Sequence, residues 1–311
     1  MDLSFIIPAY NEAGNIENVI DSIKTCVPDI YRYEVLVVDH GSSDDTVKLA
    51  EACGALVLVH PEGTIAGLRN FGVGNSTGVI LVFLDADILL TEEWGLHIGK
   101  VISSLSTGER VLTGSWYSVP DNPNWIEKFW FKPLERGDNS HINSGHLIIS
   151  RQLFDEVGGF DEQLETGEDY DISVRAKAAN IRLIDDVRLK VIHAGYPKSL
   201  FEFAKREFWH GKGDATSLKS LFQSKVAMVA LLFVALHIAL ITFSVVGNEI
   251  AVYFLSAGII GVVEGMVCLK YRTEAIGTII VNSFIYYVYF WARGLSVLSL
   301  PGIRNVQKRM R

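Results

Sequence analysis

Cysteine is scarce in this chain of 311 residues, and clustered basic charge is missing from its N-terminal part. The three cysteines are scattered, without the paired spacing of a metal or redox site, and we expect them to be buried, reduced thiols. They are Cys26, Cys53 and Cys268. The formal net charge is -8, and no basic stripe occurs in the first two thirds of the chain, which argues against a nucleic-acid partner.

Two phosphate-binding motifs and a secretory leader are also missing. No G-x-G-x-x-G follows the first apolar stretch and no G-x-x-x-x-G-K-[ST] occurs in the chain, which disfavours a dinucleotide oxidoreductase and a P-loop NTPase. The first residues, MDLSFIIPAYNE, have no basic segment, and their apolar stretch is too short for a signal peptide. We therefore expect the N-terminal domain to lie in the cytosol.

Charge nearly disappears after Lys225. With 49% hydrophobic residues and a mean hydropathy of +0.25, the chain is more apolar than an ordinary soluble enzyme. Three apolar runs approach the length of about 20 residues that a membrane span needs. They are Val226–Val246, Ile250–Cys268 and Ala275–Leu298. We predict a soluble domain over residues 1–197, an amphipathic interfacial segment over 198–225, a membrane region of two or three helices over 226–300 and a basic tail over 301–311.

The basic residues that flank these runs conflict over topology. Basic residues precede the first run, follow the second and form the tail, and each group favours the cytosolic side. They are Lys219 and Lys225, Lys270 and Arg272, and Arg304, Lys308, Arg309 and Arg311. Three full spans would place the tail outside. Either the third run is re-entrant or interfacial, or the second does not cross.

The first 195 residues alternate apolar strands with amphipathic helices, a pattern that predicts an α/β fold with a mostly parallel sheet covered on both faces. The predicted strands are Leu3–Ile7, Glu34–Val38, Ala55–Val59, Val79–Leu84, Gly108–Val119 and Arg188–His193. Helices are predicted around Ile16–Ile23, after a serine-capped turn at Gly41–Asp45, and at Ala66–Asn75, Ser150–Val157 and from Glu168.

Polar clusters follow three of the predicted strands at their carboxyl ends, where open parallel sheets bind ligands. They are Asn11-Glu12, Asp39-His40 and Asp85-Ala86-Asp87. Oxygen ligands such as Asp85 and Asp87 suit Mg²⁺ or Mn²⁺, which would bridge the protein to a diphosphate. The alternative is an acidic turn before a helix, where acids are favourable in the first turn. A metal and a diphosphate without the missing loops point to a nucleotide-sugar.

The set of motifs over residues 3–195 resembles the family-two glycosyltransferases, which have the nucleotide-diphospho-sugar (A-type) fold. The matching stretches follow the family's order: Pro8-Ala9-Tyr10-Asn11-Glu12, Val37-Val38-Asp39-His40-Gly41-Ser42-Ser43-Asp44, Gly67-Leu68-Arg69-Asn70, Phe83-Leu84-Asp85-Ala86-Asp87, Gly158-Gly159-Phe160-Asp161-Glu162 and Gly167-Glu168-Asp169-Tyr170-Asp171.

The resemblance implies a donor site. Pro8, Tyr10 and Glu12 would border the nucleotide pocket. Asp39 would hold the base or ribose, Arg69 would approach the diphosphate or sugar, and Asp85 would approach the ribose or sugar. The donor would be a nucleotide-sugar and the cofactor Mg²⁺ or Mn²⁺.

The resemblance also implies a metal site and a catalytic base. Asp87 would be the main metal ligand, and His193 would contact the metal or the diphosphate, with a purely structural histidine as the alternative. Asp169 would be the general base for an acceptor hydroxyl, which gives inversion at the anomeric carbon. Glu168 would orient that base or the acceptor, and helix capping by this pair does not exclude catalysis.

His40 departs from the family pattern, which usually has a second Asp there that contacts the base. An imidazole lacks the acceptor pair of a carboxylate, so the choice of base stays open. His141 and His146 flank an expected acceptor-side wall, Asn143-Ser144-Gly145, as structural or substrate-lining residues. The aromatic residues of the loop at Tyr117–Arg136 would pack mostly on the sheet, with sugar stacking as the alternative.

We therefore expect a membrane-anchored, metal-dependent, inverting glycosyltransferase of the cytoplasmic membrane with a cytosolic catalytic domain. Its acceptor would be a hydroxyl of a membrane-associated glycan or glycolipid, such as a polyprenyl-linked glycan. Two alternatives are a polyprenyl-phosphate sugar synthase and an inactive membrane-bound nucleotide-sugar sensor. His40 is the one hint of the latter, because Asp87 and Asp169 are both present.

Overall fold

The computed structural model describes residues 1–134, 141–213, 218–271 and 275–299, which form two compact units. Unit one consists of Met1–Pro123 and Lys132–Tyr196. Unit two consists of Asn124–Phe131 and the described residues from Pro197 onward. Arg272 and the basic tail lie outside the described residues.

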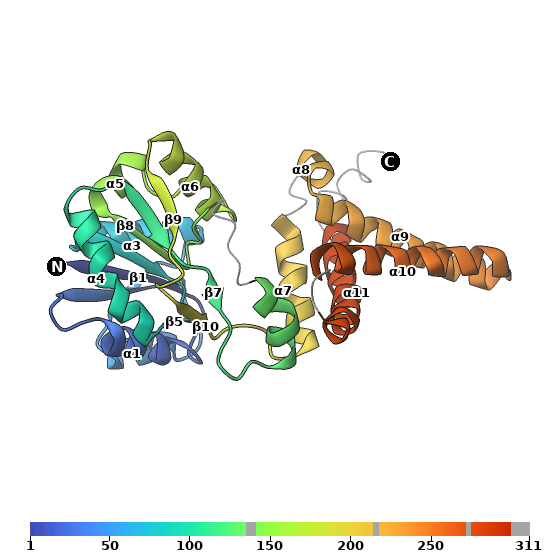
Figure 1. Ribbon diagram of the computed structural model, residues 1–311, viewed down its shortest axis with the longest axis horizontal. Helices are drawn as coiled ribbons and strands as arrows, with labels where there is room; N and C mark the ends of the chain where they lie inside the picture. The colour runs from blue at the N-terminus through green and yellow to red at the C-terminus, as the bar shows by residue number, and fades with distance from the viewer. Residues whose placement is uncertain (135–140, 214–217, 272–274, 300–311) are drawn as a thin grey trace. The chain divides into compact units, whose positions relative to one another are not determined.

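A seven-stranded sheet forms the centre of unit one (Figure 1). Its order is β3-β2-β1-β4-β8-β6-β9, and all neighbouring pairs are parallel except those made by β8. The strands are β1 (Leu3–Ala9), β2 (Tyr33–Asp39), β3 (Leu56–Val59), β4 (Ile80–Leu84), β6 (Val111–Gly114), β8 (His146–Ser150) and β9 (Arg182–Asp185). This confirms the predicted α/β fold with a mostly parallel sheet. We did not predict β8 and β9.

Helices cover both faces of this sheet because successive strand residues point to opposite sides. Leu3, Phe5 and Ile7 of β1 pack in a core with α1 and α4, whereas Ile6 packs in a second core with α3, α5 and α6. The helices are α1 (Ile16–Cys26), α2 (Thr46–Ala52), α3 (Ile65–Gly74), α4 (Glu92–Ser106), α5 (Arg151–Val157) and α6 (Glu168–Ala178). The buried strands β1 and β4 are therefore apolar on both faces.

Side chains cap three of the helices of unit one, but not α2. Thr64, Thr91 and Ser150 accept hydrogen bonds from the first turns of α3, α4 and α5. The serine cap that we expected for α2 is wrong, because the cap residue is Asp45 and its side chain makes no capping bond. Ser42 instead binds Asp39, which orders the loop at the carboxyl edge of the sheet.

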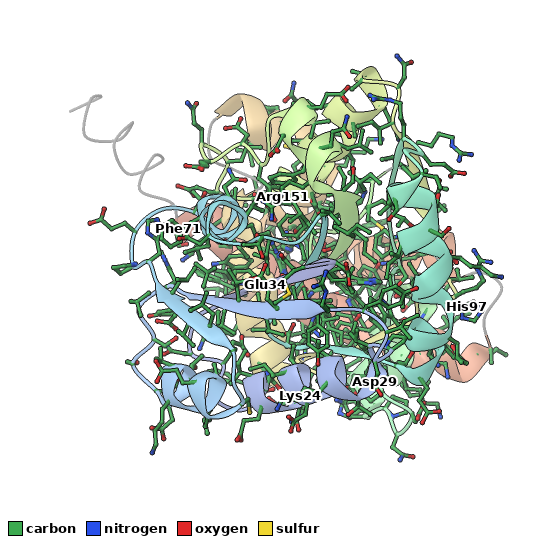
Figure 2. The ribbon with its side chains drawn as sticks, turned by 90° about the vertical axis from the view of Figure 1, so that its left-hand side faces the viewer. Lys24, Asp29, Glu34, Phe71, His97 and Arg151 are labelled. Carbon is green, nitrogen blue, oxygen red and sulfur yellow. The ribbon has the colours of Figure 1, made fainter. Side chains whose placement is uncertain are left out.

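The amino edge of the sheet is closed by structural hydrogen bonds. The Glu34 carboxylate of β2 accepts a hydrogen bond from the Ser4 hydroxyl at 2.7 Å and from the Thr77 backbone N–H at 2.6 Å (Figure 2). Arg151 donates to the carbonyl of Gly78 at 2.9 Å. These bonds join β1, β2 and the turn before β4, so polar residues at this edge already have structural partners.

A smaller three-stranded sheet has the order β5-β10-β7. Its strands are β5 (Ile88–Leu90), β7 (Tyr117–Ser118) and β10 (Val191–His193). The single strand predicted over Gly108–Val119 is wrong, since it divides into β6 and β7 in different sheets. Pairing of β10 with β5 places His193 opposite Ile88, one residue after Asp87.

Unit two consists mainly of helices. They are α7 (Leu200–Gly213), α8 (Leu218–Gln223), α9 (Lys225–Val246), α10 (Glu249–Tyr271), α11 (Ile276–Ser299) and a π-helix at Glu127–Phe131. Among the described helices, α9 and α10 are long and apolar enough to cross a membrane, and α11 does not meet this criterion. Cys268 on α10 is exposed, so the expected burial of this thiol is wrong; Cys26 and Cys53 are half-buried.

Aromatic residues hold the π-helix within unit two. The Trp130 ring lies 5.1 Å from that of Phe203 on α7 and 4.7 Å from that of Tyr286 on α11, and the Asn282 side chain donates to the Phe129 carbonyl at 2.9 Å. We expected these loop aromatics to pack on the sheet. For Trp130 this is wrong, because its contacts are with helices of unit two.

Candidate active site

The three predicted polar clusters meet at the carboxyl edge of the main sheet, where β1, β2 and β4 end side by side. Tyr10 follows β1, Asp39 ends β2 and Asp85 follows β4. The chain order changes direction between β1 and β4, which is the position where such sheets bind ligands. The residues that α3 and α6 contribute lie at this same edge.

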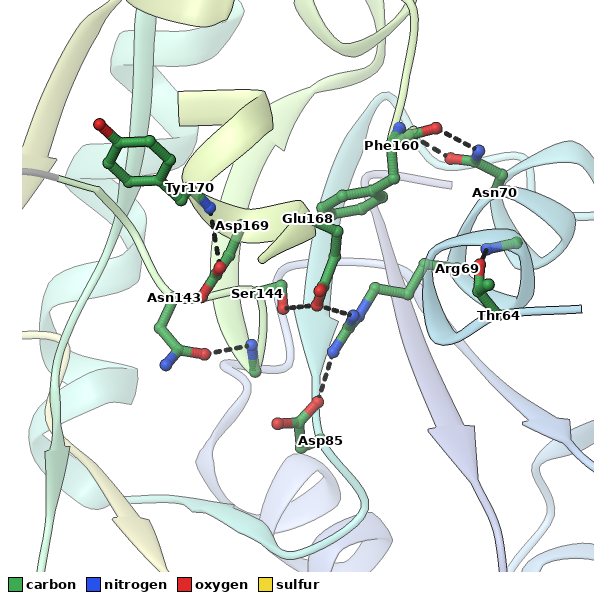
Figure 3. A network of polar contacts seen from close by, with 12 residues as sticks. Thr64, Arg69, Asn70, Asp85, Asn143, Ser144, Phe160, Glu168, Asp169 and Tyr170 are labelled. Carbon is green, nitrogen blue, oxygen red and sulfur yellow. Dashed lines mark hydrogen bonds and ion pairs between the residues drawn. The ribbon is translucent and has the colours of Figure 1, made fainter. Parts of the chain in front are cut away.

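Arg69 of α3 links two carboxylates in the interior of this site (Figure 3). Its Nη1 donates to Glu168 Oε1 at 2.8 Å and its Nη2 donates to Asp85 Oδ1 at 2.6 Å. Ser144 donates to the same Glu168 oxygen at 2.9 Å. The guanidinium is 1% exposed and lies over the Phe160 ring, 5.7 Å from its centroid. One buried cation therefore fixes the first Asp of the acidic motif to the residue before the predicted base.

Electrostatics keep this arginine charged. Burial alone would lower the pKa of Arg69, but Asp85 and Glu168 outweigh burial and raise that pKa above its ordinary value. Both terminal nitrogens of Arg69 have carboxylate partners. We therefore assign Arg69 to holding Asp85 and Glu168 in place.

Asp85 is packed closely against the turn that precedes β8. Its backbone N–H donates to the carbonyl of Gly145 at 3.1 Å. A Cβ atom at Gly145 would lie 2.3 Å from Asp85 Oδ2 and 2.2 Å from the Tyr117 hydroxyl, so this position requires glycine. Tyr117 donates a hydrogen bond to Asn143 Oδ1. The pKa of Tyr117 is raised well above its ordinary value, by burial first and then by carboxylates that include Asp85, Asp87 and Asp169.

Asp87 and His193 lie side by side. Asp87 Oδ2 is 3.6 Å from His193 Nδ1, and the two side chains are 19% and 13% exposed. The His193 ring stacks on Tyr196 with centroids 4.1 Å apart. A Cβ atom at Gly195 would lie 1.9 Å from Asp87 Oδ2. A small residue is therefore required beside this carboxylate.

Asp169 lies in the first turn of α6, after the left-handed Gly167. Its Oδ1 accepts a hydrogen bond from the Tyr170 N–H at 2.7 Å (Figure 3). Burial, and next the Glu168 carboxylate, raise the pKa of Asp169, while His141 and Arg69 lower it. A raised pKa is typical of a carboxylate that accepts protons near neutral pH.

The remaining donor-side residues lie at the mouth of the same edge. Tyr10 is 58% exposed, with its ring 6.1 Å from that of His40. Burial raises the pKa of Glu12, and Asp85 adds to this in spite of a hydrogen bond from Asn15.

Two of the predicted donor residues are structural at their own positions. Pro8 is buried within β1. Asp39 is 1% exposed, and its carboxylate accepts hydrogen bonds from the N–H groups of Gly41 and Ser42, both at 2.9 Å, and from the Ser42 hydroxyl. These bonds shape the loop that carries His40.

The two histidines that flank the acceptor-side wall have different surroundings. His146 is fully buried, with Trp94 Nε1 at 3.0 Å from its Nε2 and the Ser115 backbone N at 3.0 Å from its Nδ1. Burial lowers the pKa of His146 to about 3, so its ring is neutral and structural. His141 instead lies beside Asp169, 3.8 Å from Nε2 to Oδ2.

The pair Asp87 and His193 fits a metal site in which phosphate oxygens of the substrate provide the remaining ligands. No group of three or more His, Cys, Asp or Glu side chains within the described ranges is arranged to hold a metal ion. Asp87 and His193 would supply one oxygen and one nitrogen ligand, and Mg²⁺ typically takes one or two carboxylates together with substrate phosphates. The sequence reasoning missed Tyr117 as a site residue, because nothing local to a two-residue strand marks it.

Residues 4–158 match the family model described as Glycosyl transferase family 2. The glycosyltransferase AglE of Haloferax volcanii is 29% identical over 241 residues, which cover 71% of this chain and 77% of the relative. The amylovoran biosynthesis glycosyltransferase AmsB of Erwinia amylovora is 26% identical over 249 residues, which cover 71% of this chain and 76% of that protein.

Solved structures show the same fold at lower identity. The mannosyltransferase PcManGT from Pyrobaculum calidifontis, in complex with GDP-Man and Mn²⁺, has a TM-score of 0.57 and 19% identity, and the match covers 96% of this chain and 87% of that one. GalNAc-T7 with UDP, GalNAc and Mn²⁺ has a TM-score of 0.50 and 18% identity, covering 68% and 50%. The family match and the relatives show that residues 4–158 carry a family-two glycosyltransferase domain and that the chain is a glycosyltransferase.

Proposed function

We propose that this protein is a metal-dependent, inverting glycosyltransferase that transfers a sugar to a hydroxyl of a membrane-associated glycan or glycolipid. The observation that carries the proposal is the position of Asp169. This half-buried carboxylate lies next to Glu168, which Arg69 joins to Asp85 of the acidic motif. A base and a donor site are thereby held by one buried network.

Inversion follows from a single displacement. The acceptor O–H bond breaks and its proton moves to the Asp169 carboxylate, while the acceptor oxygen forms a bond to the anomeric carbon. The bond from that carbon to the diphosphate oxygen breaks, and its electron pair leaves with the diphosphate. The raised pKa of Asp169 suits it to accept the proton. Glu168, held by Arg69 and Ser144, positions the first turn of α6 for this step.

Asp87 and His193 would hold the divalent ion, Mg²⁺ or Mn²⁺, together with the diphosphate. When bound, the ion neutralises the charge that develops on the leaving diphosphate. Tyr10, Glu12 and the loop that Asp39 shapes would line the remaining donor side at the ends of β1 and β2. Two of the fold relatives were solved with a nucleotide or nucleotide-sugar and Mn²⁺, which supports this assignment.

A membrane anchor would place the enzyme beside a lipid-linked acceptor. Only Gly247 and Asn248 separate the candidate spans α9 and α10. If both helices cross the membrane, the chain returns to the side from which it entered. Lys225 and Lys270 then share the cytosolic side, which agrees with the positive-inside rule. In this arrangement α11 lies at the interface, and the catalytic unit is cytosolic at the cytoplasmic membrane.

The test is a nucleotide-release panel on the full chain in detergent with Mn²⁺ or Mg²⁺. UDP-, GDP- and dTDP-sugars are offered one at a time, and the freed nucleotide is measured with and without a membrane lipid extract. We expect release from one donor that the extract stimulates and a chelator abolishes. Metal-dependent binding of a donor with no release from any would contradict the proposal and favour a nucleotide-sugar sensor.

Gly195→Ala tests the metal assignment without removing a ligand. The new Cβ would lie 1.9 Å from Asp87 Oδ2, so the carboxylate must move. We expect Mn²⁺-dependent donor binding to weaken by about tenfold or more, since a displaced ligand costs more than about 1.4 kcal/mol. Equilibrium dialysis of the donor with and without Mn²⁺ gives the result.

Gly14→Ala is the matched control for this replacement, because nothing lies within 4 Å of a Cβ there. Unchanged Mn²⁺ dependence in Gly195→Ala would place the metal ligand elsewhere.

A further inference from the structure

His141 contacts the proposed base from a separate part of the chain. It precedes β8, whereas Asp169 belongs to α6. His141 Nε2 lies 3.8 Å from Asp169 Oδ2, and the two side chains are 21% and 18% exposed. The other Asp169 oxygen, Oδ1, already accepts the Tyr170 N–H. The imidazole therefore faces the carboxylate oxygen that is not used in the helix turn.

Aromatic rings fix the orientation of this imidazole. The Trp116 ring meets the His141 ring edge-on, with centroids 5.6 Å apart, and the Tyr170 ring does so at 6.1 Å. Edge-to-face geometry is a favoured arrangement of aromatic rings. Trp116, which directly precedes β7, and Tyr170 of α6 thus hold the His141 ring beside Asp169.

The charges that face Asp169 make this contact significant. They are Glu168, which raises its pKa, and Arg69 and His141, which lower it. The two terminal nitrogens of Arg69 are held by Glu168 and Asp85. Of these two cationic groups, His141 is the one within ion-pair distance of Asp169.

We propose that His141 is a positioning residue whose protonated ring fixes the Asp169 carboxylate and keeps it ionised for reaction. The inference rests on the proposed role of Asp169 as the base. A protonated imidazole beside a carboxylate favours the ionised carboxylate, and it therefore opposes the uptake of a proton by Asp169. Activity is expected to be lost as the pH falls through the pKa of Asp169. Because His141 lowers that pKa, it moves the loss of activity to lower pH.

The experiment measures kcat/KM for the acceptor against pH, with the donor saturating, in the full-length protein. His141→Gln removes the charge, His141→Lys restores a cation, and His97→Gln is the matched control. His97 is a half-buried histidine on α4 whose Nδ1 bonds the Glu93 carbonyl (Figure 2). On the acidic side of the profile, kcat/KM falls as the pH falls, and we call this part the acidic limb. We expect His141→Gln to move the acidic limb upward by about one pH unit, which is a tenfold lower kcat/KM at a given pH on that limb. The Lys variant should recover the original position.

Two results would overturn the inference, and they have different meanings. An acidic limb that stays in place in folded His141→Gln, even with a lower plateau, would show that His141 is merely structural. Full activity of Asp169→Asn would instead remove the base itself and the proposed mechanism with it. If His141→Gln does not fold, His141→Asn compared with His141→Lys provides the same comparison of a neutral with a cationic side chain.

Discussion

Replacing Asp169 by Asn is expected to lower kcat by about 10²–10⁴-fold, the usual contribution of a general base. The amide has the shape of the carboxylate, and its oxygen can still accept the Tyr170 N–H that Asp169 Oδ1 accepts at 2.7 Å. It cannot take up the acceptor proton. Donor binding should therefore be unchanged, and the loss should appear in kcat when transfer is measured with saturating donor and metal.

Asp171→Asn is the control for this replacement. Asp171 lies in the same first turn of α6, but its carboxylate bonds Arg175 one turn later in the helix. Neutralising Asp171 removes the same charge from the same end of α6 but leaves the proposed base in place. We therefore expect near-normal transfer. Near-normal transfer by Asp169→Asn as well would show that the base lies elsewhere.

Replacing Arg69 by Met is expected to cost about 3–5 kcal/mol of unfolding free energy, as removal of one partner from a buried ion pair does. Arg69 is 1% exposed, and its loss leaves Glu168 and Asp85 without their shared cation. Transfer should be lost as well, because both carboxylates would lose their orientation. Lys should not restore function, since a single ammonium replaces the two-pronged guanidinium.

Arg110→Met is the control on the surface. Arg110 and Glu156 form an ion pair in which both side chains are 41% exposed, and such solvent-screened pairs contribute little to stability. Thermal or urea unfolding of both variants makes the comparison. Glu168→Gln added to Arg69→Met should recover part of the stability, because it removes one unpaired buried charge. Equal stability of Arg69→Met and Arg110→Met would contradict the network.

The donor side of the site could be predicted because its signals are local. β1, β2 and β4 are apolar runs, and each is followed at once by the polar residues that reach the sheet edge. Parallel pairing then brings these residues together whatever the register of the rest of the chain. For that reason Asp39 and Asp85 could be placed at one edge before any coordinates were known.

The acceptor side depends on contacts between distant residues, and sequence patterns did not reveal it. β8 has five residues and joins directly to α5; we predicted the helix from Ser150 and assigned no strand to the short apolar run before it. The antiparallel pairing of β8 with β4 is what brings Ser144 to Glu168 and Gly145 to Asp85. The resemblance already named His193 as a metal or diphosphate contact, but its place beside Asp87 follows from the pairing between β10 and β5.

The antiparallel strand β8 also divides the enzyme along its sequence. Every residue that we assign to the nucleotide lies before this strand, whereas the proposed base comes after it, and the family match ends at residue 158, ahead of Asp169. The segment before β8 thus carries most of the proposed donor site and the segment after it carries the proposed base, while His193 is a contribution of the later segment to the diphosphate side. Because the Arg69 guanidinium joins the earlier segment to Glu168 of the later one, any replacement of the segment after β8 would have to supply a carboxylate at the position of Glu168.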